Sequence, residues 1–371
     1  MPVYWSMLLI TVIINLFCYQ LPLNKIIING KESKRINKIF VITLVGYIIF
    51  FIGFRDKVLD SGAYIKSFKE LPLNLNELFL YLNAIDSGKG FYLLSGIFKI
   101  FVSENHYSWL FTIAIVSCYF LFKNLYKYSI DFPLTAYLFV STTTFTWLLN
   151  GTRQFLVVCI LFGFMDWILQ KNKIKYILLV LILTTIHSSA IFISFIVFFI
   201  STKQIFSKKM LIFMFVTIIG TIYSENIFIF LDNVSESMNY SESLKLNGGA
   251  NILRFFESSI PLLIIILNYN NLKKIAPPFI KLAINMSLIG SCFDFAATFT
   301  NGILVGRMSI YFSVYNLYLL PWLIKNSFTK ASSKIIYGLC IVCYFVYFYY
   351  QMCIAWNGLM YVSEVLGLEF L

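Results

Sequence analysis

The stretch IFVITLVGYIIFFIGFRDK, residues 39–57, determines the class of this protein. Its run 39–54 carries no charged residue and is nearly as long as a bilayer span, and Arg55, Asp56 and Lys57 follow directly. Similar runs recur along the 371-residue chain, which is 59% hydrophobic and 12% charged. A soluble protein of this size cannot bury that much apolar surface. The sequence therefore predicts an all-α, polytopic integral membrane protein.

The apolar runs predict about 10–12 transmembrane helices in a single integral membrane domain, residues 1–371. Two stretches, 91–103 and 176–200, are ambiguous. The first run lacks a basic n-region and an A-x-A-like cleavage site, so we interpret it as a retained span and not as a signal peptide. The clearest runs lie at 3–21, 39–54, 107–122, 132–149, 153–170, 210–231, 255–268, 279–300, 308–324 and 335–351.

The placement of charge orients these spans. Short basic clusters between apolar runs are typical of cytoplasmic loops, and most acidic residues fall in the other set of loops. One orientation, with both termini outside, satisfies the whole chain. It places two long polar loops, 55–90 and 232–254, at the outer face. The cytoplasmic clusters are Lys25 to Lys38, Lys123 with Lys127, Lys171 to Lys175, Lys203 to Lys209, Lys273 to Lys281 and Lys325 to Lys334.

The same orientation constrains the two ambiguous stretches. Residues 91–103 lie between the spans 39–54 and 107–122. These two spans already take the chain out of the cytoplasm and back, so the stretch 91–103 should not cross the membrane. It is short and contains Lys99, which favours an interfacial or re-entrant helix at the outer face. Residues 176–200 must cross twice or not at all, and a hairpin of two short helices that breaks near IHSSA satisfies this rule. The alternative is one span, with the Lys203 cluster misassigned.

Composition also excludes several classes of partner. The formal charge of +12 does not indicate nucleic acid, because the basic residues sit between apolar runs as membrane anchors do. The seven cysteines are scattered through apolar runs without metal-ligand spacing. Only two histidines occur, which excludes a multi-His metal site. We therefore expect no nucleic acid, no metal and no other cofactor.

Four of the five arginines fall outside the cytoplasmic clusters. Arg55 follows a span, Arg153 lies at a tight hairpin between two spans, and Arg307 opens a span, all near the outer headgroup level. One interpretation is that they are interfacial anchors or ion-pair partners of acidic residues. The other is a shared site for an anionic ligand, because the planar fork of arginine suits phosphate oxygens. The repeated departure from the positive-inside pattern favours the shared site.

Other polar residues interrupt the apolar pattern. His187 lies within an apolar run, where it is either a structural hydrogen-bonding group or a functional general base or phosphate ligand. Asp60 and Tyr64 are one helical turn apart and can present one polar face. Asp294 is an acid within a span, and we expect it to neutralise an arginine.

In chain order, these residues resemble the EpsG family, the Wzy-type polymerases of bacterial O-antigen and exopolysaccharide. The elements are Arg55, then Asp60 and Tyr64, then GTRQF at 151–155, IHSSAIF at 186–192 and GRMSIYF at 306–312. The resemblance covers residues 50–320. It marks Arg55, Asp60, Tyr64, Arg153, Gln154, His187, Ser188, Arg307 and Tyr311.

The resemblance implies a glycosyltransferase that joins undecaprenyl-diphosphate-linked oligosaccharide repeat units at the outer face of the bacterial inner membrane. Membrane lipid and a chain-length regulator are further candidate partners. Guanidinium groups would stabilise the charge that grows on the diphosphate leaving group. The implied roles are diphosphate binding by Arg153, Arg307 and, after them, Arg55; general base for His187, with Asp60 as the alternative; and substrate lining by Tyr64, Gln154, Ser188 and Tyr311.

Three rival functions remain at this point. A flippase for the same lipid-linked sugars needs polar residues along a path through the midplane, whereas here the basic residues stay near one face. An O-antigen ligase would use the same chemistry with another acceptor. A membrane acyltransferase would centre on a histidine and leave the outer arginines without a role.

Overall fold

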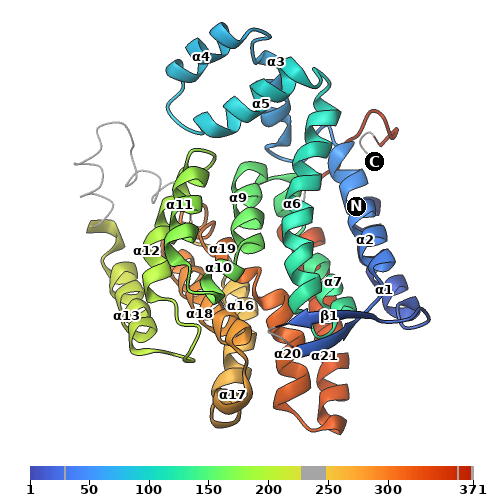
Figure 1. Cartoon of the computed structure of the whole chain (residues 1–371), viewed down its shortest axis with the longest axis vertical. Helices are drawn as coiled ribbons and strands as arrows, with labels where there is room; N and C mark the ends of the chain where they lie inside the picture. The colour runs from blue at the N-terminus through green and yellow to red at the C-terminus, as the bar shows by residue number, and fades with distance from the viewer. Residues whose placement is uncertain (29–30, 227–247, 357–358, 369–371) are drawn as a thin grey trace. The chain divides into compact units, whose positions relative to one another are not determined.

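The computed structural model describes residues 1–28, 31–226, 248–356 and 359–368, and helices dominate them (Figure 1). This confirms the prediction of an all-α polytopic membrane protein. The chain forms two compact units, which are described separately below. The first unit comprises Met1–Ser194 and Lys334–Leu371, and the second comprises Phe195–Ser333.

A helix occurs at each of the ten clearest predicted spans. Of the described helices, fewer than the predicted 10–12 are long and apolar enough to cross a membrane alone, because several are short or broken. Among the described residues, a pair of helices, Ile252–Leu267 and Tyr269–Ile275, is long and apolar enough together but is bent by 88°. Shorter apolar helices lie at Pro2–Phe17, Lys38–Gly53, Phe132–Ser141 and Ser188–Phe199. The helices that suffice individually are His106–Tyr128, Thr152–Leu169, Pro278–Phe299 and Lys330–Ala355.

One break has a clear local cause and places a predicted site residue. The run 132–149 divides into α7 (Phe132–Ser141) and α8 (Thr146–Leu149). Between them, the Thr142 hydroxyl donates to the carbonyl of Leu138 at 2.7 Å. The next residue, Thr143, has a left-handed φ of 61°, which interrupts the right-handed helix. The chain then reaches Arg153 through a short turn instead of through the end of one long helix.

Helix α6 (His106–Tyr128) forms the centre of the first unit and packs between α2 (Lys38–Gly53) and α9 (Thr152–Gly163). A Cβ atom on Gly53 would lie 2.5 Å from the Phe111 ring, so glycine permits the close approach of α2 to α6. The Asn124 amide donates to the carbonyl of Phe162 at 2.6 Å and joins α6 to α9. Helices α1 (Pro2–Phe17) and α7 pack on each other in the same unit.

The first unit has two chemically different ends. At one end, a hairpin of β1 (Asn24–Ile28) and β2 (Lys31–Arg35), which the sequence did not predict, reaches the end of α6. There Arg35 donates to the carbonyl of Lys127 at 3.2 Å, and Lys127 forms an ion pair with Asp166. Residue 55 follows the other end of α2. Within this unit, the predicted cytoplasmic cluster and Arg55 therefore lie at opposite ends.

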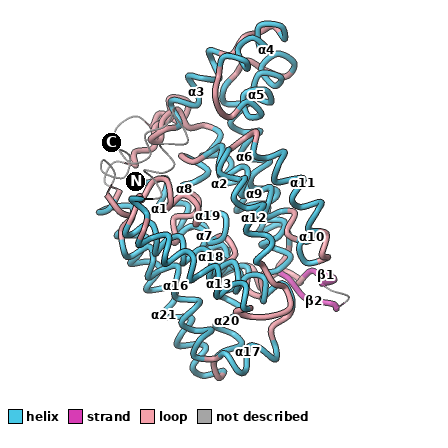
Figure 2. Tube along the Cα trace, turned by 90° about the vertical axis from the view of Figure 1, so that its left-hand side faces the viewer, coloured by secondary structure: helices cyan, strands magenta, loops and turns pink. Residues whose placement is uncertain are grey.

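Three helices gather beyond the start of α6 (Figure 2): α3 (Ser61–Glu70), α4 (Leu75–Ala84) and α5 (Lys89–Phe101). The Phe68 ring stacks on Trp109 of α6 with centroids 4.6 Å apart. The Trp109 indole also donates to the hydroxyl of Ser95 in α5 at 3.1 Å. Helix α5 contains most of the stretch 91–103 and is not among the described helices that could cross a membrane, as the topology argument predicts.

The stretch 176–200 is broken where the sequence predicts it. Helix α11 (Lys173–Thr184) ends before His187, a 3₁₀ turn follows at Ser188–Ala190, and α12 (Ile191–Phe199) begins after it. Because Thr185 and the two residues after it leave the helical path, the stretch is not one continuous helix, and its double crossing stays a prediction.

The second unit is built around α18 (Pro278–Phe299), which packs on α16 (Ile252–Leu267) and α13 (Lys208–Ile222). The Ser291 hydroxyl donates to the carbonyl of Ser258 at 2.9 Å and joins α18 to α16. Among its described residues, the unit also contains α17 (Tyr269–Ile275), α19 (Ile310–Ser313) and α20 (Asn316–Ser327). Helix α21 (Lys330–Tyr349) leads back into the first unit. Most of the predicted outer loop 232–254 lies outside the described residues.

The ammonium group of Lys99 fixes the end of α3. It is 7% exposed and donates to the carbonyls of Lys69 and Leu71 at 2.6 and 2.5 Å. We predict that Lys99→Met lowers the free energy of unfolding by about 1–3 kcal/mol, because two carbonyls lose a charged donor. Thermal unfolding of the purified protein in detergent measures this change. Lys66→Met is the control, since the Lys66 side chain is 78% exposed; an equal loss in both variants would contradict the assignment.

Candidate functional site

The guanidinium group of Arg55 is completely buried just beyond the end of α2. Its Nη1 donates to the carbonyl of Ile52 at 2.6 Å, and its Nη2 donates to the hydroxyl of Thr152 at 3.0 Å. Its Nε is buried and has no hydrogen-bond partner among the described residues. Buried polar groups are almost always satisfied, so this open donor makes Arg55 a candidate functional residue.

The surroundings of Arg55 leave its charge unneutralised. Burial lowers the pKa of its guanidinium to about 10, while the hydroxyls of Tyr361, Tyr64 and Tyr4 act in the opposite direction. At neutral pH the group is still protonated. In the described part of the chain it forms no ion pair with a carboxylate. An anion beside it would favour the charged form and offset part of the desolvation cost.

Arg153 is the second residue of α9 and lies among aromatic rings. Its guanidinium carbon is 5.7, 6.0 and 5.7 Å from the ring centroids of Tyr64, Phe91 and Tyr92. Each such cation–π contact contributes about 0.5–2 kcal/mol, depending on solvent exposure. Its Nε is buried without a hydrogen-bond partner, and no carboxylate of the described residues forms an ion pair with it. Aromatic rings hold this cation without cancelling its charge.

A glycine turn at the start of α5 brings two predicted motifs together. Gly88 has a left-handed φ of 73°, and a Cβ atom there would lie 2.4 Å from Nη1 of Arg153. Two residues later, the Gly90 amide donates to the carbonyl of Thr185 at 2.9 Å. The turn therefore contacts both the GTRQF motif and the end of α11, two residues before His187.

The first unit also contains the other predicted site residues Asp60, Gln154, His187 and Ser188. The amide of Asp60 donates to the side-chain oxygen of Asn150 at 3.0 Å, just ahead of the GTRQF motif. Gln154 is buried in α9 at 3% exposure. Nδ1 of His187 lies 2.8 Å from the hydroxyl of Ser189, and Ser188 begins the 3₁₀ turn. The structure thus gathers Arg55, Tyr64 and Arg153, and places the backbone before His187 beside the same glycine turn.

Arg307 and Tyr311 belong to the second unit. Arg307 is exposed in the turn before α19, whereas Tyr311 is 6% exposed within α19. Arg254 fixes this turn by donating to the carbonyl of Gly306 at 2.7 Å and to the hydroxyl of Ser309 at 3.0 Å. Its Nε also pairs with Asp294 at 3.3 Å, so the prediction that Asp294 neutralises an arginine is confirmed. A pocket shared by Arg307 with the other two arginines stays a prediction.

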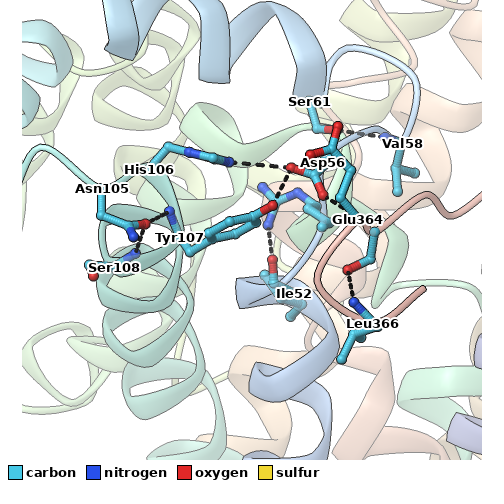
Figure 3. A network of polar contacts seen from close by, with 12 residues as sticks. Ile52, Asp56, Val58, Ser61, Asn105, His106, Tyr107, Ser108, Glu364 and Leu366 are labelled. Atoms are coloured by element: carbon cyan, nitrogen blue, oxygen red, sulfur yellow. Dashed lines mark hydrogen bonds and ion pairs between the residues drawn. The ribbon is translucent and has the colours of Figure 1, made fainter. Parts of the chain in front are cut away.

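Asp56 organises a contact that sequence reasoning missed (Figure 3). Its Oδ1 accepts from the Tyr107 hydroxyl at 2.7 Å and lies 3.3 Å from Nε2 of His106. Its Oδ2 accepts from the amide of Glu364 at 2.8 Å. Lys57 also pairs with Val362 as an isolated antiparallel bridge. The C-terminal segment is thereby tied to the residues beside Arg55, a contact for which the sequence carries no signal.

These features suit an anionic ligand. Two guanidinium groups without carboxylate partners are linked by Thr152, whose hydroxyl binds Arg55 and whose neighbour is Arg153. The guanidinium group of arginine suits phosphate oxygens, and in both residues the Nε lacks a hydrogen-bond partner among the described residues. Among the described residues, no group of three or more His, Cys, Asp and Glu side chains could hold a metal ion.

Comparison with known proteins identifies the relationship. The model of the EpsG family matches residues 4–361, nearly the whole chain. The chain belongs to the EpsG family. This EpsG protein is therefore a membrane protein of polysaccharide biosynthesis, as the resemblance of its arginine, histidine and tyrosine motifs implied. No curated protein and no solved structure matches it.

The Asp56 contacts predict how the C-terminal segment of this EpsG protein is held. We expect Asp56→Ala to release residues 359–368, because the substitution removes the acceptor of Tyr107, His106 and the Glu364 amide. Faster hydrogen exchange at the amides of this segment is the measured outcome. Glu364→Gln is the control, since only the backbone of Glu364 takes part and its side chain is exposed. Unchanged exchange in Asp56→Ala would show that the other contacts hold the segment alone.

Two glycines predict stability changes of opposite sign. Gly88→Ala should lower the free energy of unfolding by about 1–3 kcal/mol, because the new methyl group meets Arg153 and the backbone is left-handed. Gly62→Ala, within α3 and with no atom within 4 Å of the added Cβ, should raise it by about 0.5–1 kcal/mol. Thermal denaturation of both variants in the same detergent tests the contrast. A neutral Gly88→Ala would mean that Arg153 does not occupy this position.

Proposed function

We propose that this EpsG protein is a polymerase that joins undecaprenyl-diphosphate-linked oligosaccharide repeat units at the outer face of the bacterial inner membrane. The product would be O-antigen or exopolysaccharide. The single observation that carries the proposal is that two guanidinium groups lack carboxylate partners among the described residues: Arg55, which is hydrogen-bonded to Thr152, and Arg153, the next residue of α9. Both substrates carry polyprenyl tails, so a site at the headgroup level of a membrane protein suits them.

The reaction transfers the growing chain from its lipid carrier to a sugar hydroxyl on a new repeat unit. The bond between the anomeric carbon and the phosphate oxygen breaks, and a glycosidic bond to the acceptor oxygen forms. The leaving group is undecaprenyl diphosphate, so negative charge increases on it in the transition state. Within the first unit, Arg153 would stabilise that charge first and Arg55 second.

The acceptor hydroxyl must lose its proton in the same reaction. We assign that role to His187, with Asp60 as the alternative, because the pKa of histidine suits proton transfer near neutral pH. The hydrogen bond between Nδ1 of His187 and the Ser189 hydroxyl orients the imidazole. In the tautomer with the proton on Nδ1, Nε2 is the basic nitrogen. Tyr64, Gln154 and Ser188 of the same unit are proposed to line the substrate.

Charge placement favours this reaction over transport. A flippase must lead the diphosphate through the midplane, which calls for polar groups at that depth. In the first unit, Arg55 and Arg153 lie near the ends of α2 and α9, and the ion pair of Lys127 with Asp166 lies at the opposite end. A ligase would share the chemistry and differ in its acceptor.

Substitution of Arg153 tests the proposal. We predict that Arg153→Ala lowers the polymerisation rate by about 10²–10³-fold, as the loss of a preorganised transition-state donor does in other enzymes. Arg153→Lys should also lose at least about tenfold, because a point charge cannot replace a bidentate fork. The rate is measured in proteoliposomes with lipid-linked repeat units. Lys57→Ala is the matched control, since Lys57 is an exposed cation two residues from Arg55.

Cells distinguish the rival functions. A failed polymerase leaves single repeat units on the outer side, whereas a failed flippase leaves them facing the cytoplasm. If Arg153→Lys retains full activity, Arg153 is an anchor and the diphosphate assignment is wrong. If cells that carry the inactive Arg153→Ala variant accumulate repeat units on the cytoplasmic side, the polymerase proposal is wrong and the protein is a transporter.

A further inference from the structure

Tyrosine rings lead away from Arg153 toward α4. Tyr92 of α5 is 5.7 Å from the guanidinium carbon of Arg153, and the ring of Tyr81 in α4 meets Tyr92 with centroids 6.0 Å apart at 76°. Tyr64 of α3 lies on Arg153 as well, at 5.7 Å. All three tyrosines are partly exposed, so the rings form part of the surface beside the proposed diphosphate site.

The hydroxyls of these tyrosines are not used in the fold. No described residue forms a hydrogen bond with the hydroxyl of Tyr64, Tyr81 or Tyr92, although many other tyrosines here do bind through theirs. By contrast, the neighbouring ring of Phe91 is 3% exposed and packs against Trp109. The three tyrosines therefore offer an apolar face and a polar edge together, a combination suited to ligands with both kinds of surface.

The platform that carries Tyr81 and Tyr92 is rigid. Helices α4 and α5 pack closely, since a Cβ atom on Gly96 would lie 2.5 Å from the side chain of Leu78. Helix α5 is joined to α6 through Ser95 and Trp109 and to the end of α3 through Lys99. A surface held in this way loses little conformational freedom when a ligand binds.

We propose that Tyr92 and Tyr81 form a subsite for the sugar residue attached to the diphosphate at Arg153. This inference rests on the proposed function. One face of a sugar ring presents C–H groups with partial positive charge, which suit the negative face of an aromatic ring, and its hydroxyls suit the tyrosine edge. The two rings meet at a steep angle and form a corner next to the cation, where the first sugars after the diphosphate would lie.

Such a subsite gives the protein a way to distinguish its substrate from its product. The substrate carries a saccharide on the diphosphate, whereas the spent carrier is undecaprenyl diphosphate alone. Arg153 contacts the part that both share. Rings that contact only the sugar would favour the loaded carrier and promote release of the spent one, since specificity is a difference between two affinities.

The experiment compares two probes on the full-length protein in nanodiscs: undecaprenyl diphosphate alone, and the same lipid carrying one repeat unit. We expect the sugar-bearing probe to bind at least about tenfold more tightly to the unmodified protein. Tyr81→Leu should reduce this sugar-dependent gain to about twofold and leave binding of the bare lipid unchanged, because Tyr81 contacts Tyr92 and not Arg153. Tyr81→Phe should restore most of the gain by restoring the ring.

Phe79→Leu is the matched control, since Phe79 is a 55% exposed ring on the same helix. If Tyr81→Leu behaves as Phe79→Leu does, the sugar subsite is wrong, while Arg153-dependent binding of the bare lipid would leave the proposed function standing. If the unmodified protein binds neither probe, the diphosphate site fails and the subsite fails with it. Loss of the gain in Tyr81→Leu alone supports the proposal.

Discussion

The fully buried guanidinium of Arg55 is the interaction that organises the first unit. Removing a cation from water is costly unless nearby dipoles or charges replace its hydration. Here two groups accept hydrogen bonds from it: the carbonyl of Ile52 in the last turn of α2, and the hydroxyl of Thr152, the first residue of α9. The same cation therefore joins α2 to the first residue of α9, which Arg153 follows. Its Nε remains without a hydrogen-bond partner among the described residues, so the compensation is incomplete.

Asp56 explains why the charge of Arg55 stays available. This carboxylate is the nearest acid in sequence, but Tyr107, His106 and the amide of Glu364 occupy it. The acid is therefore engaged in holding the C-terminal segment and forms no ion pair with the cation beside it. Arg254 shows the opposite arrangement in the second unit, where Asp294 pairs with it and neutralises it. By this comparison, Arg55 suits ligand binding and Arg254 suits the support of a turn.

The helices α3, α4 and α5 give the site its chemical variety. They supply Tyr64 and Tyr92 around Arg153, and their glycine turn allows Gly88 to contact it. Aromatic rings stabilise a guanidinium through their quadrupole while its net charge remains. A phosphate-binding cation and sugar-binding rings can thus share one small region, as the proposed lipid-linked saccharide would require.

The sequence alone determined the membrane class, the helical fold, the break near His187 and the family, because apolar run length, charge placement and motif order are local properties of the chain. It also indicated that Asp294 would neutralise an arginine, but not that the arginine is Arg254. Only the tertiary structure decided the partners of Asp56, the hairpin at the end of α6 and the ring contacts of Arg153. These contacts join residues far apart in the chain, and packing selects them among many partners of equal local propensity.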